Sequence, residues 1–147
     1  MINCFDGKYM FLSNFYNSSC TFEGKVYPTV EHAFQAAKTL IPEEREEIRK
    51  ADTPGKAKRM GRAVTLRSDW EEVKTDVMLE CLRSKFSFRP LGIELINTGN
   101  EELVEGNTWH DNEWGSCTCD RCKNIVGKNK LGNALMTIRE EIRNDIG

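Results

Sequence analysis

Apolar residues recur at helical spacing in three stretches of the sequence. Residues three or four positions apart share one face of an α-helix, so such a run predicts a helix with one buried side. The three apolar faces consist of Val30, Ala33, Phe34, Ala37, Leu40 and Ile41; of Trp70, Val73, Val77, Cys81, Leu82 and Phe86; and of Leu131, Ala134, Leu135, Ile138 and Ile142. The pattern therefore predicts helices over 27–38, over 68–86 and at the end of the chain.

Capping residues, prolines and glycines mark further elements. Thr29 and Thr53 suit helix N-caps, because a hydroxyl oxygen accepts a hydrogen bond from a free N–H of the first turn. Ser68 and Glu71 have the spacing of a capping box, and Gly99 suits the position after a helix end. We also expect helices over 42–50, 54–61 and 90–98, strands over 2–5, 20–22, 25–27 and 102–105, a hairpin turn at Glu23-Gly24, and a loop over 107–127.

These elements predict a mainly α chain of the α+β class. Helices dominate, and a small antiparallel β element lies near the N-terminus. A doubly wound parallel sheet is not expected, because strands do not alternate with helices. At 147 residues, the chain is predicted to form a single compact domain over residues 1–147.

Charge and hydropathy exclude some classes of function. The 21 basic and 23 acidic side chains give a formal net charge of −2, whereas non-specific nucleic-acid binding favours a strongly basic chain. A local basic patch stays possible. No apolar run reaches the roughly 18–20 residues of a membrane span, and the N-terminus has no signal pattern. We therefore expect a cytoplasmic protein without a membrane partner.

The polar side of the helix over 27–38 has two interpretations. Glu31, Gln35 and Lys38 fall together opposite the apolar face, with His32 beyond them. Periodicity alone favours a solvated surface that carries a Glu–Lys stripe. The alternative is one wall of an active site, in which the helix dipole helps to keep a carboxylate ionised. Such a carboxylate could stabilise a developing positive charge or orient a water.

Other polar and aromatic residues are further candidates. Trp109 and Trp114 either cover the core or offer a stacking surface for a ring, and Asp111 between them suits a general base or a hydroxyl clamp. This loop is bordered by Glu105, Asn107 and Gly115, and a second aromatic and polar stretch contains Asn14 and Phe15. Two arginines, Arg62 and Arg67, either bind a phosphate or point into solvent.

The cysteines cluster near the end of the chain. Cys117, Cys119 and Cys122 have metal-like spacing, but a structural zinc site needs four ligands. The fourth would be His110, Cys20 or Cys4. The alternative is a loop of reduced thiols without a metal, as expected of a chain with no secretory signal.

Five segments together resemble the YbiA-like family, also called NADAR. They are FLSNFY (11–16), YPTVEHAFQAAK (27–38), GRAVTLRSDWEEVKTDVM (61–78), LINTGNEELVEGNTWHDNEWG (95–115) and GKNKLGNALMTIR (127–139). The resemblance implies a mainly helical domain and an N-glycosidase that hydrolyses the C1′–N bond of a ribosyl group. Two substrate types are implied: ADP-ribose attached to a base, notably guanine in nucleic acid, and early riboflavin-pathway intermediates with an N-linked ribose phosphate.

The resemblance also implies roles for individual residues. Glu31, Lys38 and Asp111 match catalytic positions, and Asn14, Phe15, Trp70 and Trp114 match the family's other motif residues. Glu31 and Asp111 would divide cation stabilisation and water activation between them. Lys38 would donate a hydrogen bond, or attack C1′ and pass through an imine. Neither scheme needs a metal or cofactor. A non-catalytic module that binds ADP-ribose is the alternative to an enzyme.

Overall fold

The structure is a computed structural model that describes residues 1–146 of the chain. Its residues cluster into two compact units, Asn14–Lys85 and Met1–Ser13 with the chain from Phe86 onward, called here the central and the terminal unit. The central unit holds β1 (Cys20–Phe22), β2 (Lys25–Tyr27), α1 (Val30–Ala36), α2 (Pro42–Arg49), α3 (Pro54–Gly61) and most of α4 (Trp70–Phe86). The single domain over residues 1–147 stays a prediction.

A hairpin opens the central unit, as the sequence predicts. β1 and β2 pair antiparallel, with Cys20 opposite Tyr27. Glu23 and Gly24 both have positive φ, 47° and 81°, the backbone of a two-residue turn that matches the twist of a hairpin. Cys20, Phe22 and Tyr27 are buried on its inner side.

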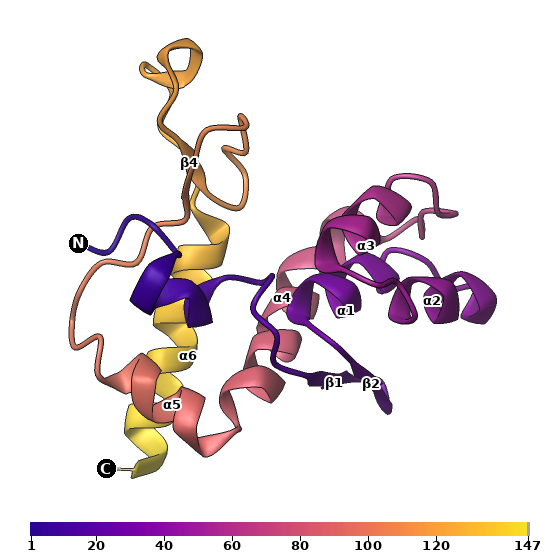
Figure 1. Ribbon diagram of the computed structural model, residues 1–147, viewed down its shortest axis with the longest axis horizontal. Helices are drawn as coiled ribbons and strands as arrows, with labels where there is room; N and C mark the ends of the chain where they lie inside the picture. Colours follow the sequence, from indigo (N-terminus) through magenta and orange to yellow (C-terminus); the bar gives the residue numbers. More distant parts are fainter. Residues whose placement is uncertain (147) are drawn as a thin grey trace. The chain divides into compact units, whose positions relative to one another are not determined.

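Helix α1 lies in the middle of the central unit, against α2, α3 and the hairpin (Figure 1). Thr29 caps it as predicted, its side chain accepting a hydrogen bond from His32 N. All residues from Val30 to Ala36 are buried, Glu31, His32 and Gln35 among them. The interpretation of this polar side as a solvated surface is therefore wrong: protein covers it.

Helix α4 has the predicted apolar face but begins two residues later than predicted, at Trp70 rather than at Ser68. Trp70, Val77, Cys81, Leu82 and Phe86 are buried. The helix begins at Trp70, so Asp69 occupies the position before the first turn and its backbone oxygen accepts from Glu72 N and Val73 N. Ser68 lies one residue too early to be the cap. The predicted capping box is therefore wrong.

The terminal unit contains η1 (Gly7–Leu12), α5 (Arg89–Ile96), β3 (Gly106–Asn107), β4 (Ser116–Cys117), η2 (Asp120–Cys122) and α6 (Lys130–Ile146). Helix α6 packs on α5 and buries Leu131, Ala134, Leu135 and Ile138, the face that its sequence predicts. The predicted loop over 107–127 is more ordered than expected, because β3 and β4 pair in parallel within it.

The predicted strands over 2–5 and 102–105 are reduced to a single parallel bridge between Ile2 and Leu103. Ile2 N donates to Glu102 O and Val104 N donates to Ile2 O, both at 2.8 Å. The chain then enters η1 at Gly7, which has φ of 54°. The predicted class, mainly helical with a small antiparallel hairpin, is confirmed.

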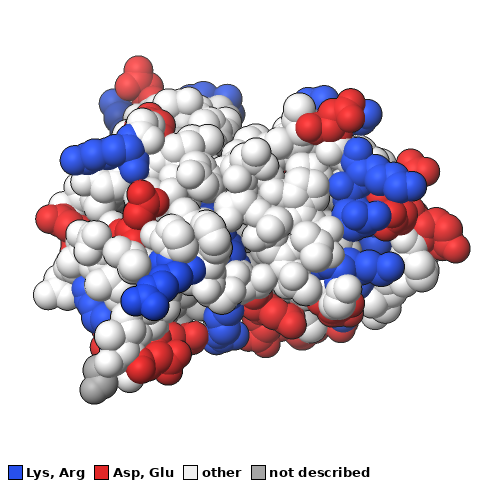
Figure 2. Space-filling view, turned by 60° about the horizontal axis from the view of Figure 1, so that its bottom comes forward, with Lys and Arg blue, Asp and Glu red and all other residues white. Residues whose placement is uncertain are grey.

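The surface charge and the helices can be compared with two expectations from the sequence: the absence of a strongly basic surface and the absence of a membrane span. In Figure 2, Lys and Arg side chains stand beside Asp and Glu side chains over the face that is drawn. That face carries no broad field of positive charge. Among residues 1–146, no helix combines the length and the apolar character needed to cross a membrane.

Candidate active site

Glu31 places a carboxylate in the interior of the central unit. It lies in the first turn of α1 and its side chain and backbone are only 7% exposed. Gln35, one turn later, donates from Nε2 to Glu31 Oε2 at 2.7 Å, and Glu31 N donates to Asn14 O at 3.1 Å. A buried carboxylate is costly unless hydrogen bonds compensate it, so Gln35 helps to hold this charge in place.

Two residues that hydrogen-bond to Glu31 each carry a buried side-chain oxygen with no hydrogen-bond donor among the described residues. These oxygens are Gln35 Oε1 and Asn14 Oδ1. Asn14 directs its amide nitrogen to Met78 Sδ at 3.6 Å, a weak acceptor. A buried acceptor left without a donor costs about 1–3 kcal/mol, so natural structures keep few of them and each calls for an explanation. Hydroxyl groups of a bound sugar are donors that would satisfy both oxygens.

Gly61, at the end of α3, allows the close approach of that helix to Gln35. A Cβ atom at Gly61 would lie 1.9 Å from Gln35 Oε1 and 2.8 Å from Gln35 Cδ. Any larger residue would therefore displace the amide that holds Glu31. No local pattern in the sequence marks Gly61 as a site residue, and nothing near it in the chain identifies Gln35 as its neighbour.

His32 and Trp70, both candidate site residues from the sequence, have structural contacts. His32 is 1% exposed. Its Nδ1 lies 2.8 Å from Thr29 Oγ1 and its Nε2 lies 3.0 Å from Ala51 O, so both ring nitrogens are used within the protein. Trp70 is 8% exposed and packs against Phe34 at 5.1 Å between ring centroids. Phe15, by contrast, is exposed.

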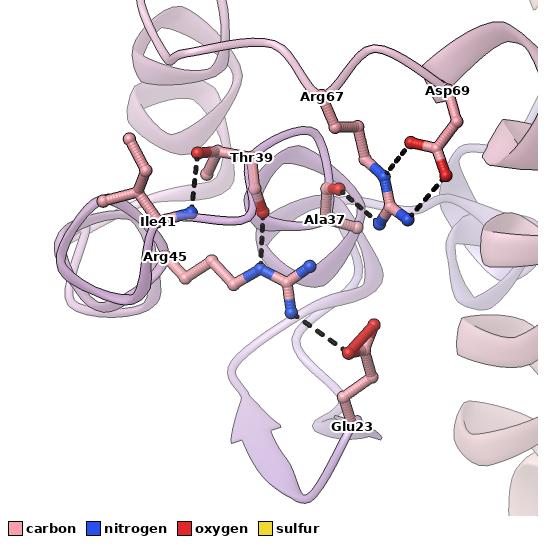
Figure 3. A network of polar contacts seen from close by, with 7 residues as sticks. All are labelled: Glu23, Ala37, Thr39, Ile41, Arg45, Arg67 and Asp69. Carbon is pink, nitrogen blue, oxygen red and sulfur yellow. Dashed lines mark hydrogen bonds and ion pairs between the residues drawn. The ribbon is translucent and has the colours of Figure 1, made fainter.

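Arg67, a candidate phosphate ligand, already holds a carboxylate (Figure 3). Its Nε and Nη2 donate to the two oxygens of Asp69 at 2.6 and 3.0 Å, and its Nη1 points to Ala37 O at 3.4 Å. The Asp69 carboxylate raises the pKa of Arg67 through these hydrogen bonds. Arg67 N also donates to Lys38 O at 2.8 Å, so this arginine braces the half-buried Lys38 at the end of α1. Arg62 is exposed.

Asn107 organises the loop that carries Asp111 in the terminal unit. Its Nδ2 donates to Glu105 Oε2 at 3.0 Å and to Asp111 O at 2.9 Å, and its Oδ1 accepts from Asp111 N at 3.2 Å. A Cβ atom at Gly115 would lie 1.9 Å from Glu105 Oε2. Glu105, Asn107, Asp111 and Gly115 thus form one packed unit, as the sequence grouped them.

The Asp111 carboxylate is fixed through one of its oxygens. Asp111 Oδ1 accepts from Glu113 N at 3.1 Å and from Trp114 N at 2.9 Å. The Trp114 ring lies 5.7 Å from the ammonium of Lys130, which also pairs with Glu113 at 3.0 Å. Trp109 is 57% exposed. A flat exposed ring of this kind offers a stacking surface for a base.

The cysteine-rich part of the loop gathers four metal-ligating side chains. One ligand atom from each of His110, Cys117, Cys119 and Cys122 lies within 4.8 Å of all the others. Burial raises the pKa of the Cys117 thiol, but hydrogen bonds from Cys119 and Cys122 outweigh it and bring that pKa to about 6. Cys4 and Cys20, the other two candidates for a fourth ligand, are not in this group.

A family model described as NADAR domain matches residues 4–143. The chain belongs to the NADAR family. An N-glycosidase YbiA of Escherichia coli (strain K12) is 42% identical over 133 residues, which cover 88% of this chain and 79% of that protein. An N-glycosidase of Nostoc punctiforme (strain ATCC 29133 / PCC 73102) is 39% identical over 142 residues, which cover 90% of this chain and 85% of that protein.

A solved structure also resembles this NADAR chain. The NMR structure of the E. coli protein YbiA has a TM-score of 0.84 and 39% sequence identity, and the match covers 99% of this chain and 87% of that one. A riboflavin biosynthesis protein of Vibrio vulnificus (strain YJ016) is 34% identical over 94% of this chain, which corresponds to 37% of that longer protein.

Proposed function

We propose that this NADAR protein is an N-glycosidase that hydrolyses the C1′–N bond between ADP-ribose and guanine, and so reverses ADP-ribosylation of guanine. Relatives that match most of this chain are named N-glycosidases, which supports hydrolysis of an N-glycosyl bond. The observation that carries the proposal is the buried Glu31 carboxylate together with the donor-free side-chain oxygens of Gln35 and Asn14, the two residues that hydrogen-bond to Glu31. Guanine as the leaving base rests on the family resemblance.

Glu31 suits stabilisation of the transition state. Cleavage of a ribosyl C1′–N bond develops positive charge on C1′ and the ring oxygen, and a fixed carboxylate in a water-poor site stabilises it strongly. Gln35 holds Oε2 of Glu31. We expect Gln35 Oε1 and Asn14 Oδ1 to accept hydrogen bonds from ribose hydroxyls, which would orient C1′ toward the carboxylate.

Asp111 suits activation of the attacking water. Hydrogen bonds from Glu113 N and Trp114 N fix its Oδ1, which leaves Oδ2 to take a proton. Glycoside hydrolysis commonly divides its work between two carboxyl groups in this way. Trp109 would stack on the base or on adenine, and Arg62, which is exposed, would bind phosphate.

Lys38 gives the proposal an alternative first step. Its amine could donate a hydrogen bond to the leaving base, or attack C1′ and release the base before water cleaves the resulting imine. Borohydride reduces an imine to a stable amine. A protein–sugar adduct at Lys38 after borohydride treatment would support the imine route, and full activity with no trapped adduct would exclude it.

A second candidate function is hydrolysis of riboflavin-pathway intermediates that carry an N-linked ribose phosphate. The similarity to proteins named for riboflavin biosynthesis, from Vibrio vulnificus and Zea mays, favours it. The same chemistry at C1′ would apply, with an amino-pyrimidine as the leaving group. A third candidate is a module that binds ADP-ribose without turnover.

A release assay separates these functions. Purified protein is incubated with ADP-ribosyl-guanosine DNA, with ADP-ribosyl protein and with an amino-pyrimidine ribose phosphate, and the products are separated by chromatography. We expect release of ADP-ribose from the guanine substrate. Release only from the pyrimidine substrate would favour the second candidate, hydrolysis of riboflavin-pathway intermediates. Thermal stabilisation by ADP-ribose without any release would favour the binding module.

Variants link the activity to the site. We expect Glu31→Gln to lower kcat by about 10²–10³-fold, the usual effect of losing a fixed electrostatic contact to the transition state. Glu43→Gln is the matched control, because Glu43 also lies in the first turn of a helix but is exposed. Equal kcat for the Glu31 variant and the wild type would refute the assignment of this site.

A further inference from the structure

The loop between β3 and α6 brings together side chains that the proposed reaction does not use. His110 follows β3, Cys117 ends β4, Cys119 precedes η2 and Cys122 ends it. β3 and β4 are held together by their parallel pairing and by Thr118 N, which donates to Asn107 O at 2.7 Å. Hence β4 and η2 position the cysteines, while His110 lies in the loop that follows β3.

The ligand atoms of this cluster all lie within 4.8 Å of one another, close to the spacing of a tetrahedral metal site. His110 Nδ1 lies 3.3 Å from Cys119 Sγ, 3.4 Å from Cys122 Sγ and 3.8 Å from Cys117 Sγ. Cys117 Sγ lies 3.3 Å from Cys119 Sγ. Ligand atoms placed tetrahedrally at zinc bond lengths, about 2.3 Å for sulfur and 2.0–2.1 Å for nitrogen, stand about 3.5–3.8 Å apart. Small side-chain shifts would therefore centre an ion between them.

We propose that His110, Cys117, Cys119 and Cys122 bind one zinc ion in a closed structural site. A tetrahedral set of three sulfurs and one imidazole selects zinc among the common divalent cations. With four protein ligands, no coordination position is left for water or substrate. The ion therefore fixes the loop and takes no part in bond cleavage, and this inference is independent of the proposed function.

The conformation of His110 supports this assignment. Its φ is +68°, in the left-handed region that residues other than glycine adopt rarely and at a cost. This backbone directs Nδ1 toward the three sulfurs. A bond from Nδ1 to zinc would offset that cost, and the bound ring would carry its proton on Nε2. The exposed Arg121, now 3.4 Å from Nε2, would turn toward solvent.

Asn112 connects two of the ligands. Its Oδ1 accepts from Cys117 N at 2.9 Å, and its Nδ2 donates to Cys122 Sγ at 3.4 Å. Amide hydrogen bonds to ligand sulfurs position thiolates and stabilise their charge, as outer contacts of metal sites generally do. Three thiolates and one Zn²⁺ carry a net charge of −1, and the exposed cations Arg121 and Lys123 lie in the same segment to balance it.

Metal content tests the site directly. The full chain is purified under reducing conditions without chelators, and zinc is measured by mass spectrometry. We expect one zinc ion per chain in the wild type, and no zinc above background in Cys119→Ser and Cys122→Ser. Cys4→Ser is the matched control, because Cys4 is exposed and lies outside the cluster. This variant should keep the full zinc content.

Two further measurements keep the test decisive if a ligand variant fails to fold. Co²⁺ added to the metal-free, reduced wild type should give thiolate charge-transfer absorption and the visible bands of a tetrahedral complex. Asn112→Ala, which keeps all four ligands, should weaken zinc binding by about 10–100-fold in competition with a chelator. Equal zinc in wild type and Cys119→Ser, or Co²⁺ spectra without thiolate bands, would overturn the proposal. So would a Cys117–Cys119 disulfide that persists under the reducing conditions of the purification.

Discussion

Gly61→Ala tests whether Gln35 positions the Glu31 carboxylate. The added Cβ would lie 1.9 Å from Gln35 Oε1 and 2.8 Å from Gln35 Cδ, so the amide must turn away and release Glu31 Oε2. Forcing one extra carbon into a packed site lowers the free energy of unfolding by about 1–3 kcal/mol. Alanine in place of glycine within a helix raises it by roughly 0.5–1 kcal/mol. The net loss of stability is therefore at most about 2.5 kcal/mol.

The loss of activity should exceed what this loss of stability explains. A hydrogen bond to a charged group is worth about 1.5–3 kcal/mol. If the released carboxylate must return to its place before it stabilises the transition state, this free energy adds to the barrier. In that case kcat/KM falls roughly 10- to 150-fold, since about 1.4 kcal/mol corresponds to tenfold. Urea unfolding measures the loss of stability. Initial rates on the substrate identified by the release assay measure the loss of kcat/KM.

A control and a double variant make this reasoning refutable. Gly55→Ala lies on the same helix, where a new Cβ would meet nothing nearer than 3.9 Å. Its activity should equal that of the wild type. In a Gln35→Ala background, the Cβ of Gly61→Ala no longer meets an amide, so most of its cost should vanish. If Gly61→Ala costs the same free energy of unfolding with and without the Gln35 amide, the proposed clash is wrong.

Two further predictions concern stability. Thr29→Ala should cost more than the roughly 1 kcal/mol typical of a lost N-cap, because it also removes the hydroxyl at 2.8 Å from the buried His32 Nδ1; Thr53→Ala, a cap at an exposed helix start, is the matched control in thermal melts. Burial lowers the pKa of Lys85 from 10.5 to about 7, despite the opposing effect of Cys20. The unfolded chain therefore binds this proton more tightly, and Lys85 lowers stability most below pH 7 and progressively less toward pH 10.5. Lys85→Met should raise the free energy of unfolding at pH 7, and this gain should shrink as the pH rises; a gain that stays constant would contradict the assigned pKa.

The elements of this fold follow largely from local pattern. Helix α6 and its buried Leu131, Leu135 and Ile138 follow from apolar spacing, and the hairpin follows from Glu23-Gly24 between short apolar runs. These signals depend on a few neighbouring residues and are read from the chain directly. The wrong N-cap at Ser68 shows the limit of such local signals. Ser68 and Asp69 are both residue types that suit an N-cap, and only the observed start of α4 at Trp70 decides between them.

The candidate site depends on packing that local pattern does not contain. Periodicity placed Glu31 and Gln35 on a polar face, but α2 and α3, which bury that face, come later in the chain. The role of Gly61 has no local signal, because its φ is not unusual and its neighbour Gln35 lies 26 positions earlier (61 minus 35). Spacing did mark the three clustered cysteines, but only the fold selects His110 rather than Cys4 or Cys20 as their partner.

The complete burial of α1 has a consequence for how the site forms. A helix of seven residues is too short to persist alone in water, and α1 has no solvent-facing side on which it could fray separately. Its amide hydrogens should therefore exchange with solvent mainly when the central unit opens as a whole. Glu31 and Gln35 would then have no partly organised intermediate, so the population of molecules with this pair in place would equal the folded population of the unit that contains it.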